Sequence, residues 1–202
     1  MRFEGGETLR RELEIARRDY NIQRIDGLEP KKVNPPEEAI PRILREVEIV
    51  KEARKRDDAR QDFLQQFRWP VQGRITGVYG SQRVLNGEPR RPHYGWDIAA
   101  PAGTPVLAPA AGIVTVAEPD MYYSGGTLLL DHGHGLSSAF LHMQAISVEV
   151  GQRVERGEKL GEVGSTGRST GAHLDWRMNL FERRVDPRTL AGPMPEEVAG
   201  GS

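Results

Sequence analysis

Short apolar segments separated by glycine-containing turns make up most of the chain from Trp69 onward. They lie at residues 74–80, 104–119, 125–133, 136–143, 146–150, 159–164 and 173–180. Short segments of this kind, with no helical pattern of about 10 to 15 residues between them, are typical of antiparallel strands. The pattern therefore predicts a mainly β fold, an antiparallel sandwich or barrel rather than a parallel sheet with crossover helices.

A helical pattern precedes this β region. After Pro35 and Pro36, residues 37–67 are rich in helix formers, and their apolar positions fall near helical spacing at Ile40, Ile43, Leu44, Val47, Val50 and Leu64. We expect one long, charged, amphipathic helix here, with Pro41 as the place for a bend, packed against the β domain or a partner chain. Residues 1–34 offer at most a strand followed by extended chain.

The composition changes between these two regions. Residues 1–70 hold 31 charged residues and three glycines, whereas the remaining 132 residues hold 26 charged residues and 20 glycines. We therefore expect an N-terminal segment with its helix at residues 1–68, a β domain at 69–190 and a flexible C-terminal tail at 191–202. The final Gly-Gly-Ser resembles a linker.

Overall charge and hydrophobicity exclude some partners. The formal net charge of −1 gives no general reason to bind nucleic acid or an anionic membrane. No apolar run approaches the roughly 18 residues of a membrane span. The first residues, MRFEGGETLRRE, lack the apolar stretch of a secretory signal, so we expect any targeting segment to have been removed before this chain begins. Because the chain has no cysteine, a metal site must use His, Asp and Glu.

All five histidines lie between His93 and His173, inside the β region. The first is part of HYGWD, in which His93 and Asp97 flank Gly95. In an extended strand the two Cα atoms would be roughly 13 Å apart, too far to share one ion. Joint ligation therefore requires the chain to bend, and Gly95 permits that bend.

Alternation in HLDWRMNL predicts a strand at residues 173–180 with one polar and one apolar face. His173, Asp175, Arg177 and Asn179 fall on the polar face, and Leu174, Trp176, Met178 and Leu180 fall on the apolar face. Imidazole and carboxylate at positions 173 and 175 would lie about 6 to 7 Å apart, which suits groups acting around one ion. The alternative is a solvent-facing polar row with an ordinary Asp175–Arg177 ion pair.

The segment AFLHM contributes a further histidine. Strand alternation predicts that Phe140 and His142 share one face, with Leu141 and Met143 on the other. On this evidence alone His142 has no assigned role.

Four longer segments occur in order along the β region: FRWPVQGRITGVYGSQR, HYGWDIAAPAGTPVLAPAAGIVTVA, LLLDHGHGLSSAFLHM and VEVGQRVERGEKLGEVGSTGRSTGAHL. Together they resemble the M23 family of zinc metallopeptidases, also called LytM or lysostaphin-like domains, from about Trp69 to Pro187. The resemblance implies a β fold with a groove whose floor holds Zn²⁺.

The same resemblance suggests roles for individual residues. His93 and Asp97 take the positions of the first two zinc ligands. His142 and His173 take those of the family's two other histidines, which activate or orient the attacking water and stabilise the transition state. For His132 and His134 we favour a structural role, with substitution as a ligand as the alternative.

The chain departs from the family at the third ligand, where His-Leu-His is replaced by His173-Leu174-Asp175. Carboxylate oxygen is an accepted zinc ligand, so Asp175 is the expected third ligand, although two carboxylates would cancel the metal's formal charge and weaken its Lewis acidity. The family often has an acidic residue two positions later, where this chain has Arg177. That arginine either supports Asp175 in place or holds it away from the metal.

The expected function is that of a hydrolase, a zinc-dependent metalloendopeptidase that cuts the stem-peptide crosslinks of bacterial peptidoglycan. The alternative is a degenerate, non-catalytic LytM domain that binds or activates a cell-wall hydrolase, with the charged helix as its contact or self-inhibitory surface. A metal-free carbohydrate-binding module would explain the strands but not the retained polar positions. Family membership implies an extracytoplasmic location, in the periplasm or cell envelope.

Overall fold

The computed structural model describes residues 12, 14 and 19–195 of the 202-residue chain. Its strands are β1 (Ile22–Ile25), β2 (Arg74–Gly77), β3 (Gln82–Leu85), β4 (Glu88–Pro89), β5 (Trp96–Ala99), β6 (Pro105–Leu107), β7 (Gly112–Met121), β8 (Gly125–Asp131), β9 (Leu136–Ile146), β10 (Arg153–Val154), β11 (Lys159–Val163), β12 (His173–Leu180) and β13 (Arg183–Val185). Its helices are α1 (Pro30–Val33), η1 (Glu37–Ala39), α2 (Ile40–Ala53), η2 (Asp62–Leu64) and α3 (Arg188–Ala191).

The main sheet is antiparallel throughout, which confirms the predicted mainly β fold. Its strand order is β10-β7-β8-β9-β12-β5-β2, with β13 added beside β12 and β11 paired to both β9 and β6. A smaller sheet contains β1, β3 and β4, in which β1 runs parallel to β3. The strand suggested near the N-terminus is therefore present, but a helical turn, α1, follows it where extended chain was expected.

One face of the main sheet covers the larger hydrophobic core. Trp69, Trp96 and Trp176 meet edge to face there, with ring centroids 5.5 Å apart for Trp69–Trp96 and for Trp69–Trp176. Three alternate side chains of β12, Leu174, Trp176 and Met178, are fully buried in this core, which confirms the apolar face predicted for the strand. Leu180 is the exception, because at the end of β12 it is 44% exposed.

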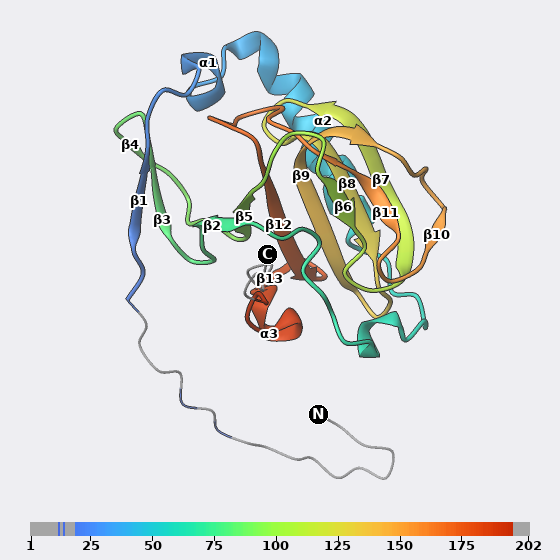
Figure 1. Ribbon diagram of the computed structural model, residues 1–202. Helices are drawn as coiled ribbons and strands as arrows, with labels where there is room; N and C mark the ends of the chain where they lie inside the picture. The colour runs from blue at the N-terminus through green and yellow to red at the C-terminus, as the bar shows by residue number, and fades with distance from the viewer. Residues whose placement is uncertain (1–11, 13, 15–18, 196–202) are drawn as a thin grey trace.

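The opposite face of the sheet lies under α2 (Figure 1). A second apolar cluster on this face is made by Val116, Met121, Leu129, Ala139 and Leu141, and Val50 and Ala53 of α2 pack against it. Strand β8 is therefore buried on both faces, which accounts for its continuous apolar run of three leucines.

The N-terminal helix is present but shorter than predicted. Helix α2 ends at Ala53, and Leu64 belongs to the separate η2. Pro41 lies in the first turn of α2, where a proline is tolerated, so it begins the helix rather than bending it. The helix stops because the following segment docks on the turn after β8: His134 donates its backbone N–H to the Asp58 carbonyl at 2.8 Å, and Phe63 donates to the His132 carbonyl at 3.0 Å.

The described part of the chain contains no helix long and apolar enough to cross a membrane. At the C-terminal end, α3 finishes at Ala191, and the segment 192–195 follows it. The rest of the expected tail, residues 196–202, lies outside the described residues.

Candidate metal centre

Two carboxylates face each other across neighbouring strands of the main sheet. Asp97 of β5 and Asp175 of β12 are directly opposed in the antiparallel register, and directly opposed residues place their side chains on the same face of a sheet. Both are buried, Asp97 at 5% and Asp175 at 0% exposure. The sheet therefore brings together two acidic groups that are 78 positions apart in sequence.

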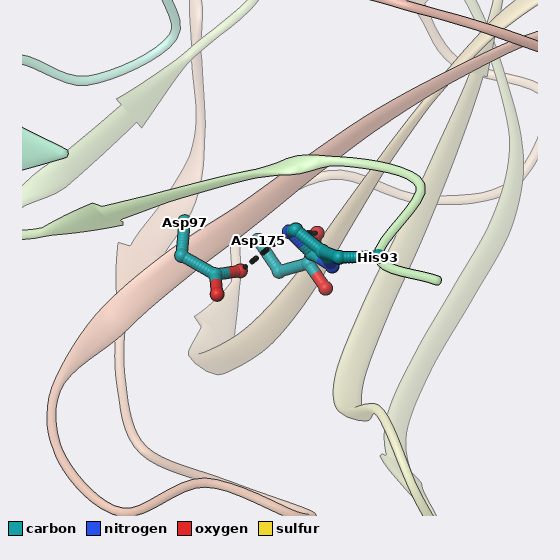
Figure 2. A group of neighbouring side chains, drawn as sticks. All are labelled: His93, Asp97 and Asp175. Carbon is teal, nitrogen blue, oxygen red and sulfur yellow. Dashed lines mark ion pairs between the residues drawn. The ribbon is translucent and has the colours of Figure 1, made fainter. Parts of the chain in front are cut away.

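His93 completes a cluster with these carboxylates from the loop that leads into β5 (Figure 2). Its backbone N–H donates to Ser81 O at 2.8 Å, and its carbonyl accepts from the Gly80 N–H at 2.7 Å. These bonds turn the chain so that His93 Nε2 lies 3.1 Å from Asp97 Oδ1 and 3.8 Å from Asp175 Oδ1. The bend required for joint ligation by His93 and Asp97 is thus present.

The glycines near the cluster leave room for its carboxylates. A Cβ at Gly95 would overlap Asp175 Oδ1, and a Cβ at Gly77 would overlap Asp97 Oδ2. The backbone at Gly95 does not have a positive φ. Gly95 therefore leaves space for the Asp175 carboxylate. This role adds to the chain bend that we expected at Gly95.

The cluster fits a divalent cation by its donor atoms. One ligand atom from each of His93, Asp97 and Asp175 lies within 4.8 Å of the others. His93 Nε2 and Asp97 Oδ1 are buried and have no hydrogen-bond partner, since their 3.1 Å approach lacks hydrogen-bond geometry. A buried polar atom without a partner costs about 1–3 kcal/mol. A cation bound by imidazole nitrogen and carboxylate oxygen would satisfy both atoms.

Each carboxylate also has its own arginine. Arg177 donates from Nε to Asp175 Oδ1 at 3.1 Å and to Oδ2 at 3.0 Å, and from Nη2 to Oδ2 at 2.5 Å. Arg83 of β3 donates to Asp97 Oδ2 and leaves Oδ1 turned toward His93. A carboxylate oxygen has more than one lone pair. On each carboxylate, the oxygen that faces His93 therefore keeps a lone pair that could bind a cation.

The arginines also set the ionisation of the site. Burial opposes ionisation of Asp175, but Arg177 and then His93 outweigh it and hold the pKa of Asp175 well below its usual range. For Asp97, burial and Asp175 oppose ionisation, whereas His93 and Arg83 hold its pKa below the ordinary value. Both carboxylates are therefore charged at neutral pH, as metal ligands must be, and two guanidinium groups already balance that charge.

His142 and His173 lie beside the cluster and beside each other, with ring centroids 4.7 Å apart. His173 Nε2 is 4.0 Å from Asp97 Oδ1. His142 Nδ1 lies 2.8 Å from the Thr166 carbonyl, and His173 Nδ1 lies 2.8 Å from the Gly171 carbonyl. Since a carbonyl only accepts, Nδ1 carries the proton on both rings, which leaves the lone pair of each on Nε2.

The strand alternation predicted around His142 is wrong. His142 has φ +67°, and the register of β8 with β9 shifts next to it, so β9 carries one extra residue there. Phe140 and Met143 consequently lie in the same core, while Leu141 packs in the cluster under α2. A bulge depends on the pairing of distant strands, which the local sequence does not reveal.

The other two histidines have different surroundings. His132 is fully buried, with Nδ1 2.8 Å from the Ala111 carbonyl and Nε2 2.9 Å from Ser138 Oγ. Both of its nitrogens are therefore engaged, and burial lowers its pKa to about 4. His134 is half exposed beside Asp57 and Phe63. These surroundings agree with the structural role that we favoured for both.

The structure thus brings together every residue singled out from the sequence for this site: His93, Asp97, His142, His173, Asp175 and Arg177. Sequence reasoning missed Arg83, and it missed the carbonyls of Thr166 and Gly171 that orient the imidazoles. No local pattern in the sequence marks Arg83. Its partner, Asp97, lies on β5, which follows the β3–β4 hairpin, so the two residues meet only in the folded chain.

An antiparallel β domain with buried His and Asp ligand atoms and two adjoining imidazoles defines a candidate metal-dependent hydrolase. The family model described as peptidase family M23 matches residues 91–187. The chain belongs to peptidase family M23.

Known relatives and solved structures agree with this assignment. The peptidoglycan DD-endopeptidase ShyA of Vibrio cholerae is 32% identical over 145 residues, which cover 71% of this chain and 34% of ShyA. A crystal structure from Pseudomonas aeruginosa, assigned to peptidase M23, has a TM-score of 0.69 and 39% identity, covering 77% of this chain and 63% of that one. A zinc-containing peptidase from Vibrio cholerae has a TM-score of 0.57 and 32% identity, covering 65% of this chain and 41% of that one. This chain spans about a third of the length of ShyA.

Proposed function

We propose that this chain is a zinc-dependent endopeptidase that hydrolyses peptide crosslinks of bacterial peptidoglycan in the periplasm or cell envelope. The observation that carries the proposal is the convergence of two buried, unpartnered ligand atoms, His93 Nε2 and Asp97 Oδ1, with Asp175 Oδ1. The endopeptidase name of ShyA supports the substrate class, and the zinc-containing neighbour supports the metal.

In this proposal His93, Asp97 and Asp175 hold the ion, and Arg83 and Arg177 keep the two carboxylates ionised and oriented. A divalent cation at this position would polarise a peptide carbonyl and lower the pKa of a bound water. We assign Arg177 to supporting Asp175, since its hydrogen bonds leave Asp175 Oδ1 3.8 Å from His93 Nε2.

The two imidazoles handle the proton and the developing charge. His173 Nε2 faces the cluster 4.0 Å from Asp97 Oδ1, which suits a group that accepts a proton from the attacking water. Burial, followed by the nearby His173, lowers the pKa of His142 to about 4, so its imidazole is neutral at pH 7. We infer that His142 takes up a proton only when negative charge develops beside it, as on a tetrahedral oxyanion.

Digestion of purified peptidoglycan tests this function. We expect crosslinked muropeptides to be cleaved, and cleavage to stop when the uncharged chelator 1,10-phenanthroline is added and to return with zinc. The matched control for His variants is His134→Ala, which changes a half-exposed histidine outside the site. Intact crosslinks after long digestion with zinc-supplemented protein would rule out the proposal.

A second function, binding or activating a cell-wall hydrolase without cleavage, is favoured by one specific observation. Arg83 and Arg177 pair with Asp97 and Asp175 and balance their charges, so the cluster has less need of a cation than an uncompensated pair of carboxylates would. Stoichiometric zinc binding separates the two functions, because the non-catalytic domain has no use for the metal.

A further inference from the structure

A cavity of about 630 Å³ lies between α2 and the face of the main sheet, next to the metal centre. Its lining includes His142, Asp175 and Arg177, so it is continuous with the site. Val47 and Val50 of α2 form an apolar wall, opposed by Leu129 and Leu141 of the sheet. The cavity therefore offers room for a peptide-sized ligand beside the residues of the proposed reaction.

The charge of this cavity differs from that of the whole chain. Seven basic side chains and three acidic ones line it, although the chain as a whole has a net charge of −1. Six of the basic residues are arginines: Arg54, Arg83, Arg91, Arg168, Arg177 and Arg184. Arg83 and Arg177 are bound to the carboxylates of the cluster.

The remaining four arginines have no ion-pair partner among the described residues. Arg168 lies over the Tyr123 ring at 4.7 Å, and Arg184 donates to Asn179 Oδ1 at 3.0 Å, but neither meets a carboxylate. Arg54, the residue directly after α2, has a buried Nε without a hydrogen-bond partner. Arg54 and Arg168 are half-buried, and Arg91 and Arg184 are exposed. Because the half-buried guanidinium groups meet no carboxylate, this part of the cavity is short of negative charge.

Desolvation and crowding of positive charge in the cavity lower the pKa of two of these arginines. Burial, followed by repulsion from Arg184 and Arg177, lowers the pKa of Arg54 to about 9. Desolvation by the surrounding protein, followed by the charge of Arg177, also lowers the pKa of Arg184, although its side chain is exposed at the mouth of the cavity. An anion between these groups would relieve the repulsion and pair with Arg54. Since guanidinium groups bind carboxylates through parallel hydrogen bonds, a carboxylate suits the geometry of the side chain.

We propose that this cavity binds the carboxylates of an acidic peptide, with Arg54 as a residue that determines specificity. The apolar wall of α2 would contact the aliphatic parts of that peptide, and the arginines would bind its charged groups. The identification of this peptide with part of the substrate rests on the proposed function, whereas the binding itself does not depend on the metal.

Isothermal titration calorimetry on the full chain tests this inference without reference to catalysis. The protein is stripped of metal with 1,10-phenanthroline and dialysed, because EDTA is itself a polycarboxylate. The probes are the tripeptide Glu-Glu-Glu, its uncharged counterpart Gln-Gln-Gln, and inorganic phosphate. We expect Glu-Glu-Glu to bind more weakly as salt is raised, since the attraction between charges is screened, and we expect Gln-Gln-Gln not to bind.

Arg54→Gln should weaken Glu-Glu-Glu binding by about tenfold, as expected for loss of one charge-assisted contact. Arg45→Gln is the matched control, because Arg45 is exposed on α2 and lies outside the cavity. Equal binding of the two tripeptides, equal affinity of the two variants, or phosphate binding as tight as that of Glu-Glu-Glu would each overturn the proposal.

The same reagents separate this inference from the proposed function. Selective binding of Glu-Glu-Glu by a protein that leaves peptidoglycan intact would uphold the cavity and refute the enzyme. Cleavage of peptidoglycan by a protein that does not distinguish the two tripeptides would support the enzyme and refute the binding of acidic peptides in the cavity.

Discussion

The main sheet and the helix that covers it are buried to very different extents. Leu174, Trp176 and Met178 of β12 are fully buried, whereas no residue of α2 is, and Leu44 and Val47 of that helix are 62% and 56% exposed. Helix α2 is attached by Val50 and Ala53 on the apolar cluster and by polar contacts near its start. The sheet therefore provides stability and the candidate metal site, and the helix mainly provides a wall of the adjoining cavity.

Removal of a proposed catalytic side chain on the sheet should have the largest effect on the rate of peptidoglycan cleavage. His142→Ala should reduce peptidoglycan cleavage by about a hundredfold to ten-thousandfold, the range found for removal of a group that transfers protons in the transition state. Leu44→Ala on the helix should leave the turnover of a saturating substrate within about threefold, because the side chain is mostly exposed and lies outside the cavity. Initial rates of muropeptide release would measure both. Near-normal cleavage by His142→Ala would remove that residue from the mechanism.

The difference in burial predicts a difference in stability. Trp176→Ala should lower the free energy of unfolding by about 3–5 kcal/mol, because it opens a large cavity in the core. Val47→Ala should change it by less than about 0.5 kcal/mol. Urea denaturation followed by circular dichroism would compare the two. If both variants lost similar stability, α2 would be as integral to the core as β12.

Acid should weaken the β domain before it weakens the helix, because the β domain contains buried histidines, among them His132 in the turn between β8 and β9, and α2 contains none. Burial lowers the pKa of His132 to about 4, so between pH 6.5 and 4 the unfolded chain binds a proton that the folded chain does not. The contribution of His132 to stability is therefore constant above pH 7 and falls as the pH drops through this window, by about 2 kcal/mol between pH 7 and pH 5.

Urea denaturation at several pH values would detect this loss. A His132→Gln variant, although less stable overall, should show a flatter dependence on pH, because it lacks the titrating group. A wild-type stability that is constant from pH 7 to pH 5 would contradict the assignment.

The smallest expected effect concerns the attachment of α2. Glu46 accepts a hydrogen bond from the Tyr122 backbone N–H at 2.8 Å and one from Arg42 Nε at 2.7 Å, and its side chain is 17% exposed. Glu46→Ala should cost about 1 kcal/mol of unfolding free energy. Glu48→Ala, on the exposed side of the same helix, should cost less than about 0.5 kcal/mol. If Glu46→Ala cost no more than Glu48→Ala, these hydrogen bonds would not anchor the helix.

Much of the fold and of the site could be predicted from the sequence. The alternation in residues 173–180 correctly separated Trp176 from Asp175, because successive side chains of a strand point to opposite faces of the sheet. The motif HYGWD correctly required a bend between His93 and Asp97. These predictions succeeded because they depend on residues that are close in sequence.

The features that could not be predicted depend on contacts between distant segments. Arg83 meets Asp97 only once β3 and β5 are in place, and the bulge at His142 arises from the pairing of β8 with β9. Helix α2 ends early because of contacts after β8 that outweigh the helix propensity of residues 54–61. The arginine-lined cavity likewise combines residues from α2, β3, β12 and β13.

The central claim is that His93, Asp97 and Asp175 form a metal site despite the two arginines. It is tested most directly by elemental analysis of protein purified without a chelating tag and dialysed after addition of zinc. We predict about one zinc per chain, retained by the exposed control Asp57→Asn and lost in Asp175→Asn, which preserves the shape of the side chain but not its charge. Absence of zinc from the wild type, or full retention by Asp175→Asn, would contradict the account.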